Sequence, residues 1–553
     1  MGSGHILVYA FDVFVELYKA EGYSEHQAAE LILTKNLFGL EIDKRAYQLA
    51  YFAIMMKGRQ YSRRILSKKV KLNLYHFVNS GNIPEEYYER LEELSTLSST
   101  EFTPKLSSFK TKIAVFSQAA EIGSVLNLEG LSETDIEELR QFINVFDEFS
   151  NLDILYGLPE IHQRINHILD MMTVMTVKYT AVVTNPPYLN KMSTTLDKYV
   201  KDHYKDIKTD MFSVFIKMNS NLLVKGGYAG FMTPFVWMFI KSYEELRNFL
   251  IKNKSISSLI QMEYSAFEEA TVPVCCFTIK SARTEPVGNY FKLSDFRGGM
   301  RVQEEKVLEA IHDPSLDYFY QTNQSNFPKI PSSPISYWVS EIIFSTFANI
   351  MPLGELEKAG TGLQTSNGNR FLRFWYEIDT GMINKKWYHL AKGGSYRKWY
   401  GNNEYVVNWE NNGSEIKESI VTRYPYLRGN YSLVVKNEKK YFTSGVITSR
   451  VTSGKLSFRF SPNDEIFSDA TTGIFPIHNH LFYLGLLNSP ILTLITELNP
   501  TLNFQAGDLE KLPLILPKKV VDFEKKAQIL ITISKIDWDS FEESWDFRKH
   551  PLI

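Results

Sequence analysis

The sequence predicts an α/β protein built on a doubly wound sheet, with a helical insertion and a C-terminal α+β domain. Beyond residue 178, short apolar segments of strand character alternate with amphipathic helical segments, which is the order expected of a doubly wound sheet. Residues 60–177 are charged, helical in pattern and without a clear strand. From residue 346 onward, short strands and glycine turns dominate instead.

Length and composition favour several domains in a cytoplasmic protein. A chain of 553 residues with 44% hydrophobic content is too long for one ordinary domain. The formal net charge of −2 argues against nucleic-acid binding by bulk charge, so any DNA contact must come from a local basic patch. Neither a membrane-spanning stretch nor a signal-peptide pattern is visible. The adjacent Cys275 and Cys276 lie in an apolar run, which indicates buried thiols rather than a disulfide or a metal site.

The chain opens on a glycine turn that is followed by a predicted helix, Leu7–Tyr18. A Gly-x-Gly turn binds a cofactor when it follows a strand, because its backbone can then approach the ligand at the helix N-terminus. No strand precedes the turn here. The residues of the turn are Gly2, Ser3, Gly4 and His5.

A second candidate for cofactor binding is Glu41. It lies in Asn36–Asp43, a predicted short strand that ends in acid and precedes the helical run Lys44–Lys57. An acid at the tip of a second strand can accept hydrogen bonds from both ribose hydroxyls of a nucleoside cofactor. Asp43 is interpreted as the cap of the following helix. The alternative for Glu41 is a surface-loop acid, and the third strand of this sheet is expected within residues 109–128 unless that segment belongs to the insertion.

The most informative stretch is an apolar strand that stops abruptly at Asn185-Pro186-Pro187-Tyr188. Two prolines fix φ and carry no N–H, so the backbone cannot continue a sheet and its carbonyl oxygens point outward as acceptors. The Asn185 side chain adds an acceptor, and the Tyr188 ring offers a stacking face. Such acceptors suit an exocyclic amine, which donates two hydrogen bonds and becomes tetrahedral before it attacks an electrophilic methyl group. The alternative is a plain proline turn.

The elements after Tyr188 extend the sheet, and its last two strands are expected to be antiparallel. Asp210 and Phe212, at the start of the first helix, are candidate pocket residues. The predicted order is a helix over 210–223, a strand over 228–234, a helix over 244–252, and strands over 256–260 and 272–279.

The C-terminal region interleaves aromatic, amide and basic residues, a mixture that suits phosphate contacts together with readout of base edges. A β domain that faces carbohydrate or protein is the alternative. The candidate DNA contacts are Thr365, Ser366, Asn367, Arg370, Arg373, Arg397, Lys398 and Arg450.

Four segments of the chain carry resemblances to known families. The tetrapeptide Asn185–Tyr188 resembles the catalytic motif of amino-methyltransferases that use S-adenosylmethionine, above all DNA adenine-N6 enzymes; some protein-glutamine and RNA-guanine methyltransferases share it. The segment 392–402, the stretch 498–517 and the tail 537–547 make the chain similar to the PglX family of adenine-specific DNA methyltransferases of BREX phage-defence systems, which is related to type IIG restriction–modification enzymes. This resemblance covers most of the chain.

The resemblance implies a Rossmann-like class I methyltransferase domain and a C-terminal α+β target-recognition domain. In the family the glycine turn reads Asp-Pro-Ala-Cys-Gly-Ser-Gly-His and ends the central strand, so we expect the acidic residue and that strand to be missing through truncation. On the same resemblance we expect C-terminal sequence to be missing as well. The expected segments are 1–59 (cofactor part), 60–177 (helical insertion), 178–282 (catalytic part), 283–345 (linker), 346–517 (target recognition) and 518–553 (C-terminal helical segment).

The predicted function is site-specific transfer of a methyl group from S-adenosylmethionine to N6 of a flipped-out adenine, without a metal. Double-stranded DNA and other BREX proteins are the implied partners. One alternative is a truncated chain that binds DNA or partner proteins as a recognition or scaffold subunit; another is a protein-glutamine or RNA methyltransferase. We expect no nuclease activity, since no nuclease constellation is recognisable.

Overall fold

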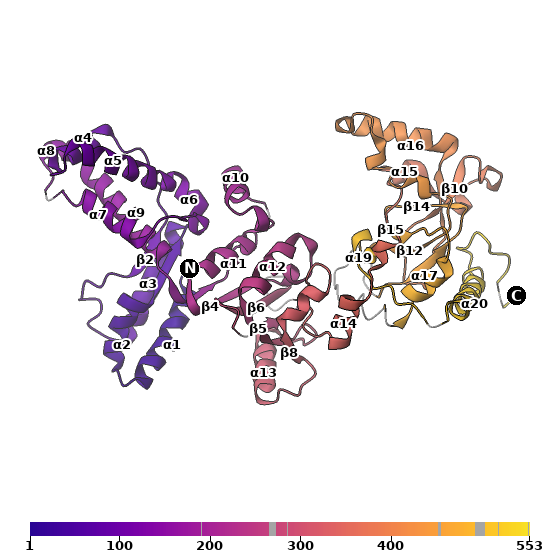
Figure 1. Ribbon diagram of the computed structural model, residues 1–553, viewed down its shortest axis with the longest axis horizontal. Coiled ribbons are helices and arrows are strands. Elements are labelled where there is room, and N and C mark those ends of the chain that lie inside the picture. The colour runs from indigo at the N-terminus through magenta and orange to yellow at the C-terminus, as the bar shows by residue number, and fades with distance from the viewer. Residues whose placement is uncertain are drawn as a thin grey trace. The chain divides into compact units, whose positions relative to one another are not determined.

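The computed structural model describes residues 1–146, 148–189, 191–264, 272–284, 286–451, 455–490, 492, 504–517, 519–550 and 552–553 (Figure 1). The chain divides into two compact units, one made of residues 1–237 and 242–324 and the other of residues 238–241 and 325–553. Of the helices in these described stretches, none is both long enough and apolar enough to cross a membrane.

The first unit begins with helices packed around two short strands. Residues Phe11, Val15, Ile32 and Ile54 lie in one buried apolar cluster that joins α1, the turn after α2, and α3. The helix and strand predicted at the N-terminus are confirmed, and Asp43 caps α3 by accepting hydrogen bonds from Arg45 N and Ala46 N. The elements are α1 (His5–Ala20), α2 (Glu25–Leu31), β1 (Phe38–Glu41), α3 (Lys44–Tyr61) and β2 (Asn73–His76).

Strand β2 contradicts the prediction that residues 60–177 contain no strand. It pairs in parallel with β1, and Glu41 lies opposite His76. Residues 109–128 do not hold the third strand, because buried side chains at helical spacing, Phe102, Phe109 and Ile113, fold this segment into helix. The insertion consists of α4 (Glu85–Leu94), α5 (Ser99–Ala114), α6 (Ala119–Ile122), α7 (Glu133–Ile143), α8 (Asn151–Leu155) and α9 (Leu158–Thr176).

The second part of this unit is a six-stranded sheet of order β3-β4-β6-β5-β7-β8. Strands β3 and β4 are parallel, and β5 and β6 are antiparallel as predicted. They are not the last strands of the sheet, because residues 287–292 and 319–323, inside the predicted linker 283–345, add two more strands to it. The rings of Phe38 on β1 and Tyr179 on β3 are 5.3 Å apart, so the two sheets meet at these strands. The elements are β3 (Tyr179–Thr184), α10 (Thr194–His203), α11 (Met211–Asn221), β4 (Leu223–Pro234), α12 (Glu244–Asn253), β5 (Ser255–Gln261), β6 (Val274–Lys280), β7 (Val287–Lys292), α13 (Gly299–His312) and β8 (Phe319–Asn323).

The second unit combines a four-stranded sheet, β14-β10-β11-β9, with a three-stranded sheet, β13-β12-β15. Its core gathers Val407, Ile416, Ile447 and Phe467 from both sheets and from α16, and short strands dominate as predicted. The elements are α14 (Glu341–Asn349), α15 (Gly368–Phe371), β9 (Leu372–Phe374), β10 (Trp387–Ala391), β11 (Tyr405–Asn408), α16 (Glu410–Arg423), β12 (Gly445–Ser449), β13 (Phe458–Ser461), β14 (Glu465–Phe467), β15 (Thr471–Ile474), α17 (His480–Leu487), α19 (Ala506–Glu510) and α20 (Val520–Trp538).

Candidate active site

The turn Asn185–Tyr188 leaves the sheet at the carboxyl end of β3. Thr184, the last residue of β3, lies opposite Phe231 of β4, so the turn emerges beside the end of that strand. Pro186 is buried, whereas Asn185, Pro187 and Tyr188 are exposed. Pro186 therefore anchors the turn and leaves the side chains of Asn185 and Tyr188 open to a ligand.

Tyr188 closes this turn on itself. Its hydroxyl lies 3.1 Å from Oδ1 of Asn185 and 3.3 Å from the carbonyl oxygen of Met232, and can donate to either. Burial raises the pKa of this hydroxyl to about 12, so it stays protonated and remains a donor at neutral pH. The Tyr188 ring is still 39% exposed, which leaves a face for stacking.

Asp210 fixes the other side of the turn. Its Oδ1 accepts a hydrogen bond from Leu189 N at 3.1 Å, and another from Phe212 N at 3.2 Å in the first turn of α11. The amide of Met211 in turn donates to the carbonyl of Leu189 at 3.1 Å. Burial raises the pKa of Asp210, and its backbone donors oppose the rise. The residue after Tyr188 is thus tied to the N-terminus of α11 through a capping carboxylate.

The predicted pocket residues Asp210 and Phe212 are both buried. The Asp210 carboxylate is engaged by backbone amides, and the Phe212 ring stacks on Tyr243 at a centroid distance of 5.4 Å. Both side chains therefore pack inside the protein and support the turn Asn185–Tyr188.

The predicted cofactor residues at the N-terminus come together. Gly2 N donates to Oε2 of Glu41 at 2.7 Å, although 39 residues separate them. The other oxygen, Oε1, accepts from Ile42 N and Asp43 N at 3.0 and 3.1 Å. Glu41 thus lies between the glycine turn and the start of α3.

The glycine turn itself depends on Gly4. It caps α1 with φ 95°, in the left-handed region, and a Cβ placed there would lie 3.0 Å from the Cα of Ala50. Ser3 Oγ and His5 Nδ1 lie 3.0 Å apart. The backbone of the turn therefore approaches α3 more closely than a side chain allows.

His76 was missed by the sequence analysis. It ends β2 opposite Glu41, and its buried Nδ1 has no hydrogen-bond partner among the described residues. Burial lowers its pKa, so the ring is neutral near pH 7. The signal that could have found this strand is the apolar alternation of Leu72 and Leu74, both buried, directly before the histidine.

The candidate DNA contacts of α15 and β9 are partly engaged within unit 2. Asn367 Oδ1 accepts from Arg370 N at 3.2 Å, and the Arg370 side chain pairs with Glu415. Arg373 donates to the carbonyl oxygens of Asn369 and Leu372, both at 2.7 Å. Thr365 and Ser366 directly precede this cluster, and Ser366 has a φ of 58°.

The remaining candidates form a second group around the loop between β10 and β11. Arg397 pairs with Asp537 at 3.4 Å and lies over the ring of Trp538, while Lys398 donates to Asn488 O at 3.0 Å. Arg450 donates to Asp469 O at 3.3 Å. Gly394 N, in the loop, donates to Ser449 Oγ at 3.0 Å, which links the loop to the residue before Arg450. Residues 498–503 of the stretch used for the resemblance lie outside the described residues.

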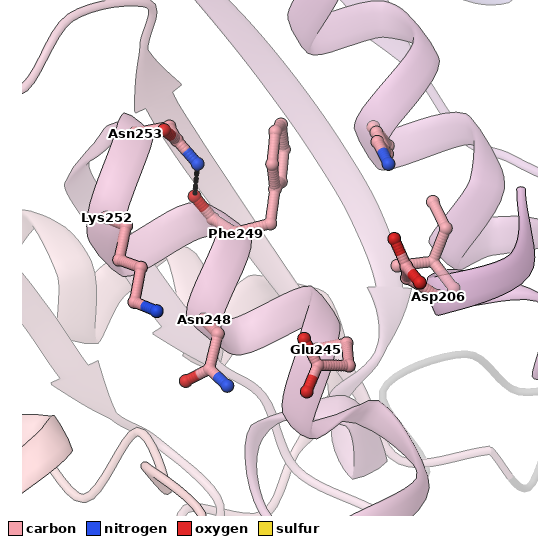
Figure 2. Close-up of a pocket in the computed structure, with 8 residues that line it drawn as sticks. Asp206, Glu245, Asn248, Phe249, Lys252 and Asn253 are labelled. Atoms are coloured by element: carbon pink, nitrogen blue, oxygen red, sulfur yellow. Dashed lines mark hydrogen bonds between the residues drawn. The ribbon is translucent and has the colours of Figure 1, made fainter.

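A separate cavity of about 200 Å³ lies between α11, α12 and the turn Lys205–Ile207 (Figure 2). Asn253 Nδ2 donates to Phe249 O at its edge. The residues that line this cavity are Asp206, Ile207, Lys217, Glu245, Asn248, Phe249, Lys252 and Asn253. Its charges are of both signs, and no candidate catalytic or cofactor residue lines it. Among the described residues, no group of three or more His, Cys, Asp or Glu side chains could hold a metal ion.

Comparisons with known proteins find similarity to methyltransferases of restriction-modification and related systems. Residues 35–267 match the family described as Eco57I restriction-modification methylase. All of the chain aligns with the adenine-specific methyltransferase PglX of Lacticaseibacillus casei (strain Zhang), at 33% identity over 46% of that protein. All of it also aligns with the adenine-specific methyltransferase BrxX of Escherichia coli O9:H4 (strain HS), at 31% identity over 46% of that protein. The chain therefore spans about half the length of the curated relatives it matches.

Among solved structures, the chain is similar to the type IIL restriction-modification enzyme MmeI in complex with DNA. The TM-score is 0.53 at 9% identity, over 98% of this chain and 72% of that chain. At this identity the likeness concerns the fold alone. The resemblance inferred from the motifs is confirmed by the two full-chain alignments.

Proposed function

We propose that this chain, which is similar to the adenine-specific methyltransferases PglX and BrxX, methylates N6 of an adenine flipped out of duplex DNA. The observation that carries the proposal is the turn after β3. There Asn185 Oδ1, which accepts from the Tyr188 hydroxyl, and the exposed Tyr188 residue lie within four consecutive residues, with the backbone carbonyl of the buried Pro186 between them.

The turn would provide hydrogen-bond acceptors for the N6 amine of adenine and a ring on which the base can stack. The two N6–H groups of adenine would donate to Asn185 Oδ1 and to the Pro186 carbonyl, which moves the nitrogen lone pair out of conjugation with the ring. A carbonyl oxygen has two lone pairs, so Asn185 can accept from Tyr188 and from the base at once. Tyr188 replaces the stacking that the base loses when it leaves the duplex.

The cofactor residues present fit S-adenosylmethionine. Glu41 would accept from the ribose hydroxyls, and the turn at Gly2 and Gly4 gives the ligand close access to backbone amides at the N-terminus of α1. When bound, S-adenosylmethionine supplies an already electrophilic methyl carbon, so the protein has only to hold and orient the amine. The carboxyl end of β2, with His76, is a further candidate for this pocket.

Unit 2 would select the DNA sequence. Support comes from its loops rich in amide, aromatic and basic residues, since arginine, asparagine and glutamine read base edges. Arg370, Arg397 and Arg450 would exchange their present partners, carboxylates and a backbone carbonyl, for phosphates or bases on binding. A role in BREX phage defence is part of the proposal, supported by the similarity to PglX and BrxX.

The test compares three classes of acceptor. Transfer of a labelled methyl group is measured to duplex DNA, RNA and protein, using this chain and a chimera in which these residues replace the matching part of the Lacticaseibacillus relative. We expect label in duplex DNA, absent with Asn185→Ala and retained with the control Asn82→Ala, which changes an exposed asparagine outside the turn. Label in protein or RNA but not in duplex DNA would refute the proposed substrate. DNA binding without transfer in both forms would support a recognition subunit instead.

A further inference from the structure

Helix α20 has two apolar faces, and only one is covered. Ala527, Ile531 and Trp538 are buried against unit 2. On another side of the helix, Ile529 is 58%, Ile533 58% and Ile536 68% exposed. Their spacing of four and three residues places these three side chains, here called the isoleucine stripe, along one face.

The isoleucine stripe has the character of a helix-packing surface. Isoleucine is stiff at χ1, so ordering it on binding costs little side-chain entropy. A solvated face of a surface helix carries polar residues instead, as Lys525 and Lys526 do one turn before the stripe. A contiguous apolar patch with a polar rim is typical of a protein interaction site.

The charges at the two ends of the stripe indicate what covers it. Lys525 is exposed at the N-terminal end, and the Asp537 side chain is 64% exposed at the other, although it also pairs with Arg397 at 3.4 Å. An antiparallel copy of the helix, centred on residue 531, places Ile529 opposite Ile533 and Lys525 opposite Asp537. A parallel copy would bring lysine against lysine, which is repulsive.

We propose that the isoleucine stripe binds the same stripe of a second copy of this chain, as an antiparallel helix pair with twofold symmetry. Such a contact is isologous: each pairing of Ile529 with Ile533 and of Lys525 with Asp537 occurs twice, which gives an apolar centre with charged ends. In the same register Ile536 lies opposite Lys526 and would pack against its aliphatic stem. The proposal is independent of the methyl-transfer reaction.

The first test is the mass of the chain in solution. Analytical ultracentrifugation over a range of concentrations should show a monomer that converts to a dimer. Ile529→Glu and Ile533→Glu should each weaken the dimer about tenfold or more, because a buried unpaired carboxylate costs more than 1.4 kcal/mol. Ile477→Glu is the control, since Ile477 is 91% exposed and lies outside the stripe; it should leave the dimer unchanged.

The second test addresses the orientation of the helices. Lys525→Asp and Asp537→Lys should each weaken the dimer, and the double variant should restore it, because the exchanged charges again face each other. Thermal melting of each variant checks that unit 2 stays folded when Asp537 loses Arg397. A monomer at every concentration, a dimer that tolerates Ile533→Glu, or a stripe occupied only by a different protein would overturn the proposal. A double variant that remains monomeric would overturn the antiparallel pairing.

Discussion

The Tyr188 hydroxyl lies 3.1 Å from Oδ1 of Asn185 and so joins the last residue of the Asn-Pro-Pro-Tyr turn to the first. This hydrogen bond orients the amide of Asn185, because only its oxygen can accept from a protonated phenol. A flipped amide would present N–H groups to an incoming amine and repel it. The bond therefore favours the orientation in which Asn185 would accept a hydrogen bond from N6 in the proposed function.

Two substitutions at Tyr188 separate this orienting role from stacking. Tyr188→Phe keeps the ring and should slow single-turnover methyl transfer about fivefold to tenfold, the value of one neutral hydrogen bond. Tyr188→Ala also removes the stacking face and should add about 1–3 kcal/mol to the barrier. Fluorescence of 2-aminopurine at the target position reports base flipping. Equal rates for the two variants would contradict a stacking role.

Asp210 should stabilise the turn rather than react. Asp210→Ala leaves the amides of Leu189 and Phe212 without their acceptor and should cost about 1–2 kcal/mol of unfolding free energy, as the loss of a helix cap does. Asp210→Asn keeps an acceptor oxygen and should recover most of that stability. Denaturant unfolding measures both. Asp206→Ala, an exposed aspartate nearby, is the control, and an equal effect there would argue against the capping role.

The two glycines of the N-terminal turn should differ in their tolerance of alanine. Gly2 and Gly4 both have positive φ, which costs a non-glycine residue about 1 kcal/mol. A Cβ at Gly2 meets open space, whereas a Cβ at Gly4 lies 3.0 Å from the backbone of Ala50. Gly4→Ala should therefore lower the melting temperature more than Gly2→Ala does. The reverse order would show that the contact with α3 does not constrain the turn.

The buried Glu465 should make unit 2 less stable as pH rises. Burial raises its pKa to about 8 from an ordinary value of 4.5. Between pH 4.5 and about 8, Glu465 is therefore protonated in the folded state and ionised in the unfolded state. The unfolding free energy of the wild type should fall with pH across this window and level off above it. Glu465→Gln should flatten the profile, measured by thermal melting at a series of pH values. An unchanged slope would show that Glu465 is ionised in the folded protein.

The central elements were predictable because their signals are local. Tyr179–Thr184 is rich in β-branched residues and ends at two prolines, which fixes both the strand and its end. Gly2 and Glu41 were both candidates for cofactor binding from the sequence, and the structure brings them into contact. Strand β2 was missed because four residues carry too short a pattern to be distinguished from a helix end.

The proposed DNA-contacting residues show that the partners of a side chain cannot be predicted from the local sequence. The sequence gives the positions of Arg370 and Arg397, but their partners Glu415 and Asp537 lie 45 and 140 residues away. Such pairings depend on tertiary packing, so a cation that reads as available in the sequence can be engaged in the fold. The isoleucine stripe of α20 shows the reverse. Its residue types suggest burial, yet the fold leaves these side chains exposed.

In the proposed function, the turn Asn185–Tyr188 holds adenine while its N6 receives the methyl group. The most direct measurement is mass spectrometry of nucleosides from duplex DNA incubated with S-adenosylmethionine and the chimeric enzyme. We predict N6-methyladenine with the wild-type turn and at least a hundredfold less with Asn185→Ala, the size of effect seen when one preorganised group that stabilises a transition state is lost. Equal N6-methyladenine from the two forms, or a methyl group on another base, would contradict the account.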